Sequence, residues 1–166
     1  MILRPATFWI EKLQLMPHPE GGYYRETYRS SDIITTCLPK RYSGPRSCST
    51  TIYFLLEGNQ FSAFHRLQSD EMWHFYTGST IDLYIINPQG ELIHQSIGPN
   101  PDNGDVFQYC IPHNCWFAAQ PANIDSYTLI GCTVSPGFDF MDFELAERQQ
   151  LMTLYPQHED LIIKFT

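Results

Sequence analysis

The sequence has no apolar run long enough to cross a membrane. No stretch approaches the roughly 20 apolar residues of a membrane span, and residues 1–16 contain neither an uninterrupted apolar core nor a small-residue cleavage site. Basic residues are also few: 10 Lys and Arg stand against 18 Asp and Glu, so the net charge is −8. Neither nucleic-acid phosphates nor anionic lipid headgroups would find matching charge on such a chain. These absences predict a cytosolic protein that binds neither nucleic acid nor membranes.

Paired cysteines are also lacking. The chain has 5 cysteines, an odd number, and no Cys-x-x-Cys motif. The sequence therefore indicates neither a disulfide framework nor a zinc ribbon, and we expect reduced, buried thiols. A chain of 166 residues can bury enough surface to fold without such cross-links. We expect a single domain that spans residues 1–166.

Aromatic residues, by contrast, make up 14% of the chain and recur with β-branched residues in short runs. Gly, Pro and Asn separate these runs. Strands are expected at residues 23–28, 50–56, 61–66, 72–76, 81–86, 91–97, 106–111, 115–119 and 127–134. Short strands at such regular spacing are typical of an all-β sandwich or barrel.

Turns and helices complete the expected architecture. The Asn-Pro-Gln-Gly segment at 87–90 predicts a hairpin, and the Glu-Gly-Asn segment at 57–59 predicts a second one more weakly. A short amphipathic helix is expected before Pro17, which would stop it. A second helix is expected over residues 144–155, with Asp142 near its cap. The barrel should therefore carry a helix at each end.

A cluster of polar and aromatic side chains around residues 64–78 holds the first candidate site. Alternation along the strand puts Glu71, Trp73 and Phe75 on one face. A carboxylate beside those rings would be desolvated, which raises its pKa and suits it to proton transfer or metal binding. His65, on the preceding strand, could meet Glu71 across the ladder and form an acid/base pair or half of a metal site. A solvated or structural His65 is the alternative.

The fragment at residues 18–26, HPEGGYYRE, has an unusual composition for a plain turn. Gly21 and Gly22 permit positive φ or close approach of the backbone. The rings and charges beside them could wall a pocket. A strand entry with a bend is the other interpretation, and the residues alone do not decide between the two.

These segments resemble the cupin superfamily, and more narrowly a subfamily of small cupins described as a domain of unknown function. The resemblance rests on ordered motifs: HPEGGYYRE at 18–26, STTIYFLL at 49–56, SAFHRLQSDEMWHFYTG at 62–78 and LIGCTVSPGFDFMDF at 129–143. It implies an all-β cupin jelly-roll barrel of about nine or more strands with short terminal helices. It also implies one concave pocket that binds a small molecule.

The cupin metal motifs are incomplete in this chain. The first motif consists of Gly, then His-x-His, then Glu with a Gly seven residues later. Here Glu71 and that last Gly keep their spacing, and a single histidine, His65, stands near the histidine positions. The second asks for Pro-x-Gly and a His three residues further on; Pro112 is kept, Asn114 replaces the Gly and Phe117 stands at the His. Two candidate ligands are fewer than a stable transition-metal site needs. We therefore expect no metal ligands and no cofactor.

The metal-free precedent among cupins is the sugar-nucleotide epimerase, in which a His held by a carboxylate acts as base and a Tyr as acid. The resemblance therefore implies a metal-independent isomerase or epimerase for a sugar-like or anionic metabolite, with His65 and Glu71 as catalytic residues. Arginines would anchor substrate charge and rings would wall the pocket. The candidate substrate-binding residues are Tyr23, Arg25, Tyr53, Arg66, Trp73, Phe75, Trp116 and Asp139.

Two other functions stay open at this point. The chain could be a non-catalytic binding protein with an aromatic cup, because such walls serve binding and catalysis alike. It could also be a metal enzyme that recruits Gln108, His113 or Cys110 as a further ligand.

The alternating rings of residues 72–76 resemble a face covered by a second subunit, and they predict a homodimer.

Overall fold

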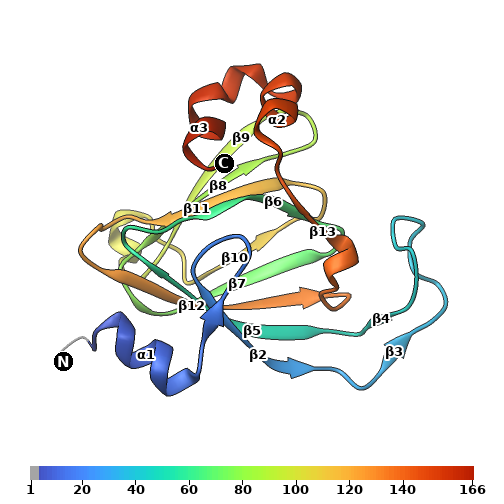
Figure 1. Cartoon of the computed structure of the whole chain (residues 1–166), viewed down its shortest axis with the longest axis horizontal. Helices are drawn as coiled ribbons and strands as arrows, with labels where there is room; N and C mark the ends of the chain where they lie inside the picture. The colour runs from blue at the N-terminus through green and yellow to red at the C-terminus, as the bar shows by residue number, and fades with distance from the viewer. Residues whose placement is uncertain (1–3) are drawn as a thin grey trace.

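The computed structural model describes residues 4–166, and two antiparallel sheets facing each other dominate it (Figure 1). The first sheet has the order β1 (Met16–Pro17), β2 (Tyr23–Arg29), β5 (Thr50–Glu57), β12 (Tyr127–Ser135), β7 (Asp70–Gly78) and β10 (Gln108–Ile111). The second has the order β13 (Phe143–Leu145), β6 (Ser62–Leu67), β11 (Trp116–Pro121), β8 (Ile81–Ile86) and β9 (Leu92–Ile97). A short separate pair joins β3 (Ile33–Ile34) to β4 (Arg46–Ser47). The nine expected strands and the jelly-roll architecture are confirmed.

Helices lie at both ends of the chain, as expected. The α-helices are α1 (Ala6–Leu13), α2 (Arg148–Leu154) and α3 (Glu159–Lys164), and the 3-10 turns are η1 (Pro101–Asn103), η2 (Phe140–Asp142) and η3 (Pro156–His158). In Figure 1, α1 lies beside the first sheet, whereas α2 and α3 gather over the second. Within residues 4–166, none of the helices combines the length and the apolar character needed to cross a membrane.

The second helix begins later than the sequence predicts. Glu144 lies in β13, which pairs with β6, and α2 begins only at Arg148. The cap of α2 is Glu147, whose carboxylate accepts hydrogen bonds from two backbone N–H groups of the first turn. Asp142 is not a helix cap, because its carboxylate is bound to Arg46. Residues 143–145 form the edge strand β13 instead of the predicted helix, because this strand completes the second sheet.

One of the two expected hairpins forms. β8 and β9 pair antiparallel around residues 87–90, and Gly90 adopts a positive φ of 82° that a tight turn requires. The second expectation was wrong, because residues 57–59 connect β5 in the first sheet to β6 in the second. A short loop here crosses between the sheets instead of joining ladder neighbours.

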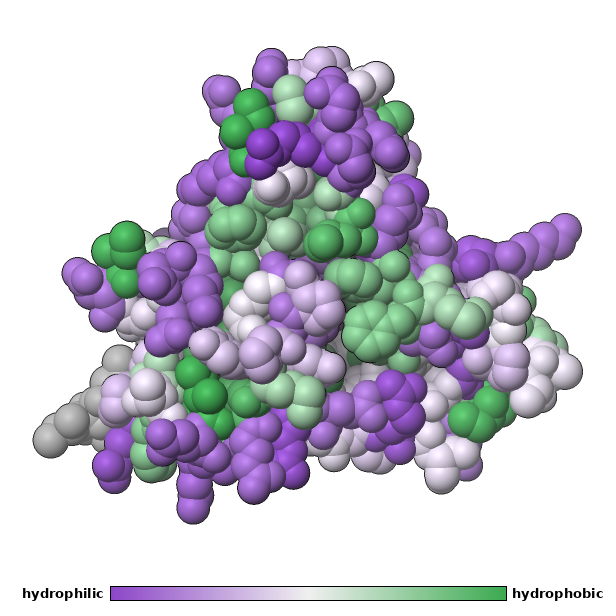
Figure 2. All heavy atoms as spheres, in the orientation of Figure 1, coloured by the Kyte–Doolittle hydropathy of each residue, from purple (hydrophilic) through white to green (hydrophobic). Residues whose placement is uncertain are grey.

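Apolar side chains form three layers, and only the middle one lies between the sheets. Inward-facing side chains such as Phe54, Trp73 and Phe117 fill the interior. A second layer packs the outer face of the second sheet against α2 and α3, and a third packs the first sheet against α1. Figure 2 shows apolar surface in the middle of one face with hydrophilic residues around it. Strand alternation thus decides which residues can reach the interior.

The cysteines only partly follow the expectation of buried thiols. Cys115 and Cys132 are buried, Cys48 is half-buried, and Cys37 and Cys110 are exposed. All five are free thiols. Of these, Cys132 is the one that faces the cavity described below.

Candidate functional site

A cavity of about 340 Å³ lies between the two sheets. Strands of the first sheet, β6 of the second, the turn before β2 and the segment after β12 all contribute side chains. Its lining consists of His18, Glu20, Tyr24, Glu26, Arg29, Thr50, Ile52, Phe54, His65, Leu67, Glu71, Cys132, Val134, Phe138, Asp139, Phe140 and Phe143. A volume of this size accommodates a small metabolite.

The turn between β1 and β2 brings two of the polar groups into this cavity. The His18 N–H donates to the Gly22 carbonyl, and the Gly21 N–H donates to the His18 carbonyl, so the chain reverses tightly. Gly21 and Gly22 have positive φ values of 117° and 68°. A side chain on Gly21 would collide with the Phe61 carbonyl oxygen. The two glycines therefore let the turn press against the second sheet and aim Glu20 inward.

Glu20 is held by several partners on β6 and by His18 in its own turn. Its backbone carbonyl accepts from the Ala63 N–H, and its Oε1 accepts from the Ser62 hydroxyl at 2.9 Å. Its Oε2 lies 3.1 Å from Nε2 of His65 and 3.4 Å from Nδ1 of His18. Burial raises the pKa of Glu20 to about 7, although His18 and Ser62 act in the opposite direction.

His65 is fixed at both ring nitrogens. Its Nδ1 lies 2.7 Å from the Ala63 carbonyl oxygen, and because a carbonyl only accepts, this nitrogen carries a hydrogen. In the neutral ring, Nε2 is therefore the nitrogen without a hydrogen, and it faces Glu20. The ring packs against Phe117 at 4.0 Å and Phe143 at 5.4 Å between centroids. Burial lowers the pKa of His65, so the neutral imidazole is favoured at pH 7.

Glu71 faces the same cavity from the opposite sheet. It is only 7% exposed, and burial raises its pKa to about 7, with His65 opposing this effect and Glu20 reinforcing it. The Trp73 indole and the Cys132 thiol also lower the pKa of Glu71, but their effect is smaller than that of burial. We call Glu20, His65 and Glu71 the proton-exchange cluster. Two of its three members are carboxyl groups that are about half-protonated near neutral pH.

His65 and Glu71 face each other, as predicted, but not as neighbours on paired strands. These residues do not meet across a ladder, since β6 pairs with β11 and β13 whereas β7 pairs with β12 and β10. They face each other across the barrel interior, and each affects the pKa of the other. The inward orientation that alternation predicts for Glu71 is present in the structure.

Most of the predicted substrate-binding residues lie outside the cavity. Of these, Asp139 contributes to the lining, together with the two predicted catalytic residues. Tyr23 and Tyr53 pack against α1, and Trp116 packs beneath α2 and α3. Trp73 and Phe75 belong to the apolar interior next to the cavity. Their positions correct the expectation that these rings contact a ligand, because each packs into one of the apolar layers.

The two arginines proposed as anionic anchors also point away from the cavity. Arg25 Nη1 donates to the Leu13 carbonyl at 3.0 Å and to the side chain of Gln14 at 2.8 Å. Arg66 pairs with Glu144 at 2.7 Å and lies over the ring of Trp116. Both expectations are corrected by strand alternation, since the inward neighbours are Tyr24 and Glu26 in β2 and His65 in β6.

Five polar or aromatic lining residues from β2 and the turn before it were not among the predicted site residues. They are His18, Glu20, Tyr24, Glu26 and Arg29. A signal for the first four existed in the motif HPEGGYYRE at 18–26, for which a pocket wall was one of two interpretations. The structure favours the pocket wall. Arg29 joins Glu26 in the lining because the register of β2 against β5 shifts between Glu26 and Tyr28.

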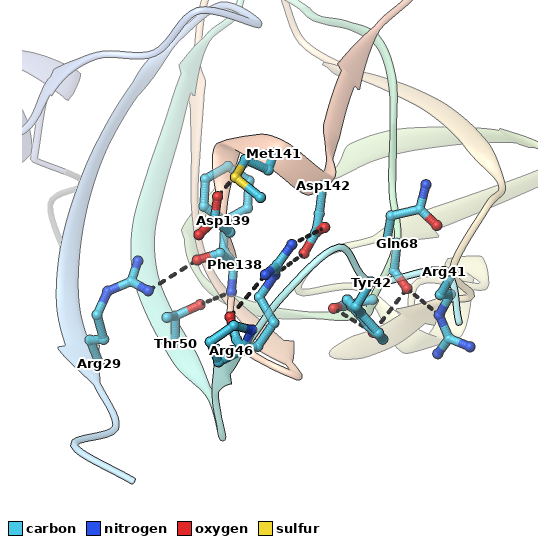
Figure 3. A network of polar contacts seen from close by, with 12 residues as sticks. Arg29, Arg41, Tyr42, Arg46, Thr50, Gln68, Phe138, Asp139, Met141 and Asp142 are labelled. Atoms are coloured by element: carbon cyan, nitrogen blue, oxygen red, sulfur yellow. Dashed lines mark hydrogen bonds and ion pairs between the residues drawn. The ribbon is translucent and has the colours of Figure 1, made fainter. Parts of the chain in front are cut away.

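The segment at residues 138–142, which we call the rim segment, borders the cavity after β12 and is held by polar contacts (Figure 3). Arg29 donates to the Phe138 carbonyl at 3.0 Å, and the Phe138 N–H donates to the hydroxyl of Thr50 at 2.9 Å. Asp142 forms a two-pronged pair with Arg46 at 2.6 and 2.7 Å, and both side chains are buried. This segment places Phe138 and Phe140 at the cavity.

The cavity does not fit the metal site that the cupin fold often carries. Phe117 occupies the place of a second-motif ligand, and its ring packs directly on His65. Asn114, which replaces the Gly of the second motif, has a positive φ of 61°. The turn is therefore present, although the His ligand that follows it in the motif is not. Within residues 4–166, no three His, Cys, Asp or Glu side chains form a group that could hold a metal ion.

The nonstandard metal ligands considered above also lie elsewhere. His113 pairs with Asp70 at 2.7 Å on the surface. Gln108 and Cys110 lie on the exposed side of β10. None of the three contributes to the cavity lining that the structure describes.

A family model described as "Cupin superfamily (DUF985)" matches residues 7–146. The chain belongs to this family. An uncharacterized protein of Saccharomyces cerevisiae, YML079W, is 30% identical over 143 residues, which are 80% of this chain and 71% of the yeast protein.

Solved structures give the same fold over nearly the whole cupin domain. Protein SO0799 from Shewanella oneidensis is similar with a TM-score of 0.88 and 39% identity, over 99% of this chain and 98% of that one. A hypothetical protein from Leishmania major reaches 0.89 at 37% identity, over 98% and 99% of the two chains. Oxalate decarboxylase from Bacillus subtilis shares the fold alone, with a TM-score of 0.56 at 10% identity, over 90% of this chain and 36% of that one.

Proposed function

We propose that this cupin is a metal-independent isomerase or epimerase that moves a proton beside a carbonyl group of a sugar-like metabolite. The observation that carries the proposal is the pair of buried carboxyl groups, Glu20 and Glu71, which line one cavity with pKa values raised to about 7. A group whose pKa lies near the working pH can take up a proton in one step and release it in another. The alternative of an anionic substrate is not favoured, because Arg25 and Arg66, which were predicted to bind its charge, lie outside the cavity.

The arrangement supports a role for each member of the proton-exchange cluster. The ionised Glu71 removes the proton from the carbon next to the carbonyl group. The protonated Glu20 donates to the carbonyl oxygen, so that a neutral enediol forms and no charge is left on the substrate. The enediol then takes a proton on carbon while the ionised Glu20 removes one of its two O–H protons. A proton added to the former carbonyl carbon, with loss of the O–H proton on its neighbour, completes isomerisation. A proton added to the opposite face of the original carbon, with loss of the O–H proton first donated by Glu20, completes epimerisation.

His65 differs from the direct base that the sequence suggests. It is 2% exposed, and its Nε2 faces Glu20. We therefore assign His65 as a positioning residue that holds the Glu20 carboxyl group and exchanges the shared proton with it. Its ring orientation is fixed by the Ala63 carbonyl, in the way that a second partner commonly fixes an imidazole tautomer.

Exchange with deuterated water tests the proposal. Aldoses and ketoses such as D-glucose, D-mannose and D-fructose are incubated with the protein in D₂O, and loss of the C1 or C2 proton signals is followed by NMR. We expect exchange to fall by roughly 10²- to 10⁴-fold in Glu71→Gln, the usual contribution of a general base. Glu11→Gln, an exposed change on α1, serves as the matched control. Exchange at the full rate in Glu71→Gln would contradict the assigned role.

A non-catalytic binding protein is the second candidate. The observation that favours it is the engagement of both nitrogens of His65, which leaves this ring no free atom for a substrate. Five aromatic rings also line the cavity and could hold a ligand without transforming it. Thermal stabilisation by a sugar that shows no proton exchange would favour this function over the isomerase.

A further inference from the structure

The cavity offers no free positive charge to a ligand. Arg29 is the one Arg or Lys among the described lining residues. Its Nε and Nη2 donate to the Glu26 carboxylate at 3.0 and 2.7 Å, and its Nη1 donates to the Phe138 carbonyl. Each nitrogen of this guanidinium therefore has a protein partner. These bonds use three of its five N–H groups, and the positive charge is paired with that of the Glu26 carboxylate.

The lining histidines do not supply positive charge either. Burial lowers the pKa of both His18 and His65, so both are neutral at pH 7. The titratable groups that face the cavity are His18, Glu20, Tyr24, Glu26, Arg29, His65, Glu71, Cys132 and Asp139. Glu26 and Arg29 cancel each other, and the remaining ionised forms are those of carboxyl groups.

Glu71 is more than nine-tenths buried and lacks a cationic partner. No Arg or Lys contributes to its pKa, and burial is the largest effect on it. Beside it, Trp73 and Cys132 supply donor groups that lower its pKa, but neither carries a positive charge. A buried carboxylate is unfavourable unless a positive group or hydrogen-bond donors meet it. The partner that Glu71 lacks is therefore a cation, which a ligand could supply.

Aromatic rings stand close to these carboxyl groups. Phe138, Phe140 and Phe143 lie within 6.2 Å of one another by ring centroids and line the cavity beside Asp139. Tyr24 lines it as well. The faces of aromatic rings attract ammonium groups, and they also pack against the C–H groups of a polyol. Rings and carboxylates together are the combination that recognises an organic ammonium ion.

We propose that the ligand of this cavity is a hydroxylated amine, with its ammonium group at Glu20 and Glu71 and its carbon skeleton against the phenylalanines. The inference goes beyond the proposed function, because carboxyl groups that are ionised to hold an ammonium group do not also supply the acid for proton transfer. It names an amino polyol as the class of ligand that this cavity binds. Binding draws Glu20 and Glu71 into their ionised forms, so protons are released at pH 7.

Three polyols that differ only at C1 test this charge preference. D-glucamine carries an ammonium group there, D-sorbitol a hydroxyl group and D-gluconate a carboxylate. Titration calorimetry at pH 7 in phosphate and in MOPS gives affinity and proton release, and Tris and HEPES are avoided because each is itself a hydroxylated amine. We expect D-glucamine to bind about tenfold more tightly than D-sorbitol, with D-gluconate the weakest, since an ammonium–carboxylate bond exceeds a neutral one. Proton release should accompany D-glucamine alone.

Variants connect the preference to the named residues. Glu71→Gln should bring D-glucamine and D-sorbitol to similar affinity, whereas the surface control Glu11→Gln should leave the tenfold difference intact. Strongest binding of D-gluconate would overturn the inference. Equal behaviour of all three polyols, including the absence of binding by any of them, would overturn it as well.

The outcome is separable from that of the proposed isomerase. If D-glucamine binds with proton release but no amino sugar or sugar exchanges protons with D₂O, the ligand class stands and the isomerase fails. If a sugar exchanges protons while D-gluconate binds best, the chemistry stands and the ligand class fails.

Discussion

Replacement of Glu71 by Gln should stabilise the protein at alkaline pH. Glu71 has an ordinary pKa of 4.5 when unfolded and a raised value of about 7 in the fold. Between these values the folded state binds more protons than the unfolded state, so the stability contribution of this group is fully present below pH 4.5 and is lost as the pH rises through 7. The difference, at about 1.4 kcal/mol per pH unit, corresponds to about 3 kcal/mol. Gln has nearly the same shape and never ionises.

Urea denaturation at pH 5 and pH 8.5 measures this effect. Glu71→Gln should unfold with a free energy close to that of the parent protein at pH 5 and about 3 kcal/mol higher at pH 8.5. His18 and His65 act in the opposite direction, since their lowered pKa values make the fold gain stability as the pH rises through 6.5. They are present in both proteins and largely cancel in the comparison. Equal differences at both pH values, or a destabilised variant at pH 8.5, would refute the reasoning.

Three further expectations concern the rim, the surface and the assembly. Asp142→Ala leaves Arg46 buried without its partner, so urea denaturation should show a loss of about 3–5 kcal/mol, and a loss below 1 would contradict this. Arg66→Ala removes only a surface pair, so polyol affinity should stay unchanged in calorimetry, and a tenfold loss would return this residue to the site. Exposed Tyr76 and its neighbours on β7 favour a homodimer, so sedimentation should give twice the 19.3 kDa of the chain and not that mass.

Strand alternation explains why some site residues could be predicted and others could not. The inward orientation of His65 and Glu71 follows from apolar alternation, and the structure has both in the cavity lining. Tyr23, Arg25 and Arg66 have side chains suited to binding a substrate, but they lie on the faces of their strands that do not line the cavity. Their nearest neighbours along the chain take the inward positions.

Other parts of the site depend on long-range geometry that the sequence does not carry. Glu20 reaches the cluster only because two glycines fold a turn against the opposite sheet. The sequence also does not show that β5 and β6 lie in different sheets, since a four-residue loop such as 58–61 usually joins neighbouring strands of one sheet. The number of strands, set by local composition, could be predicted, whereas their assignment to sheets depends on contacts between distant segments.

The attachment of the rim segment bears on how quickly a ligand enters and leaves. The proton-exchange cluster is anchored by both sheets, but the rim segment is fastened mainly through Arg29, Thr50 and the Arg46–Asp142 pair (Figure 3). Arg46 and Asp142 are 96 positions apart in the chain, and neither lines the cavity. Local opening there costs less than unfolding the barrel. Residence time can therefore change through this one pair while the groups that perform chemistry stay in place.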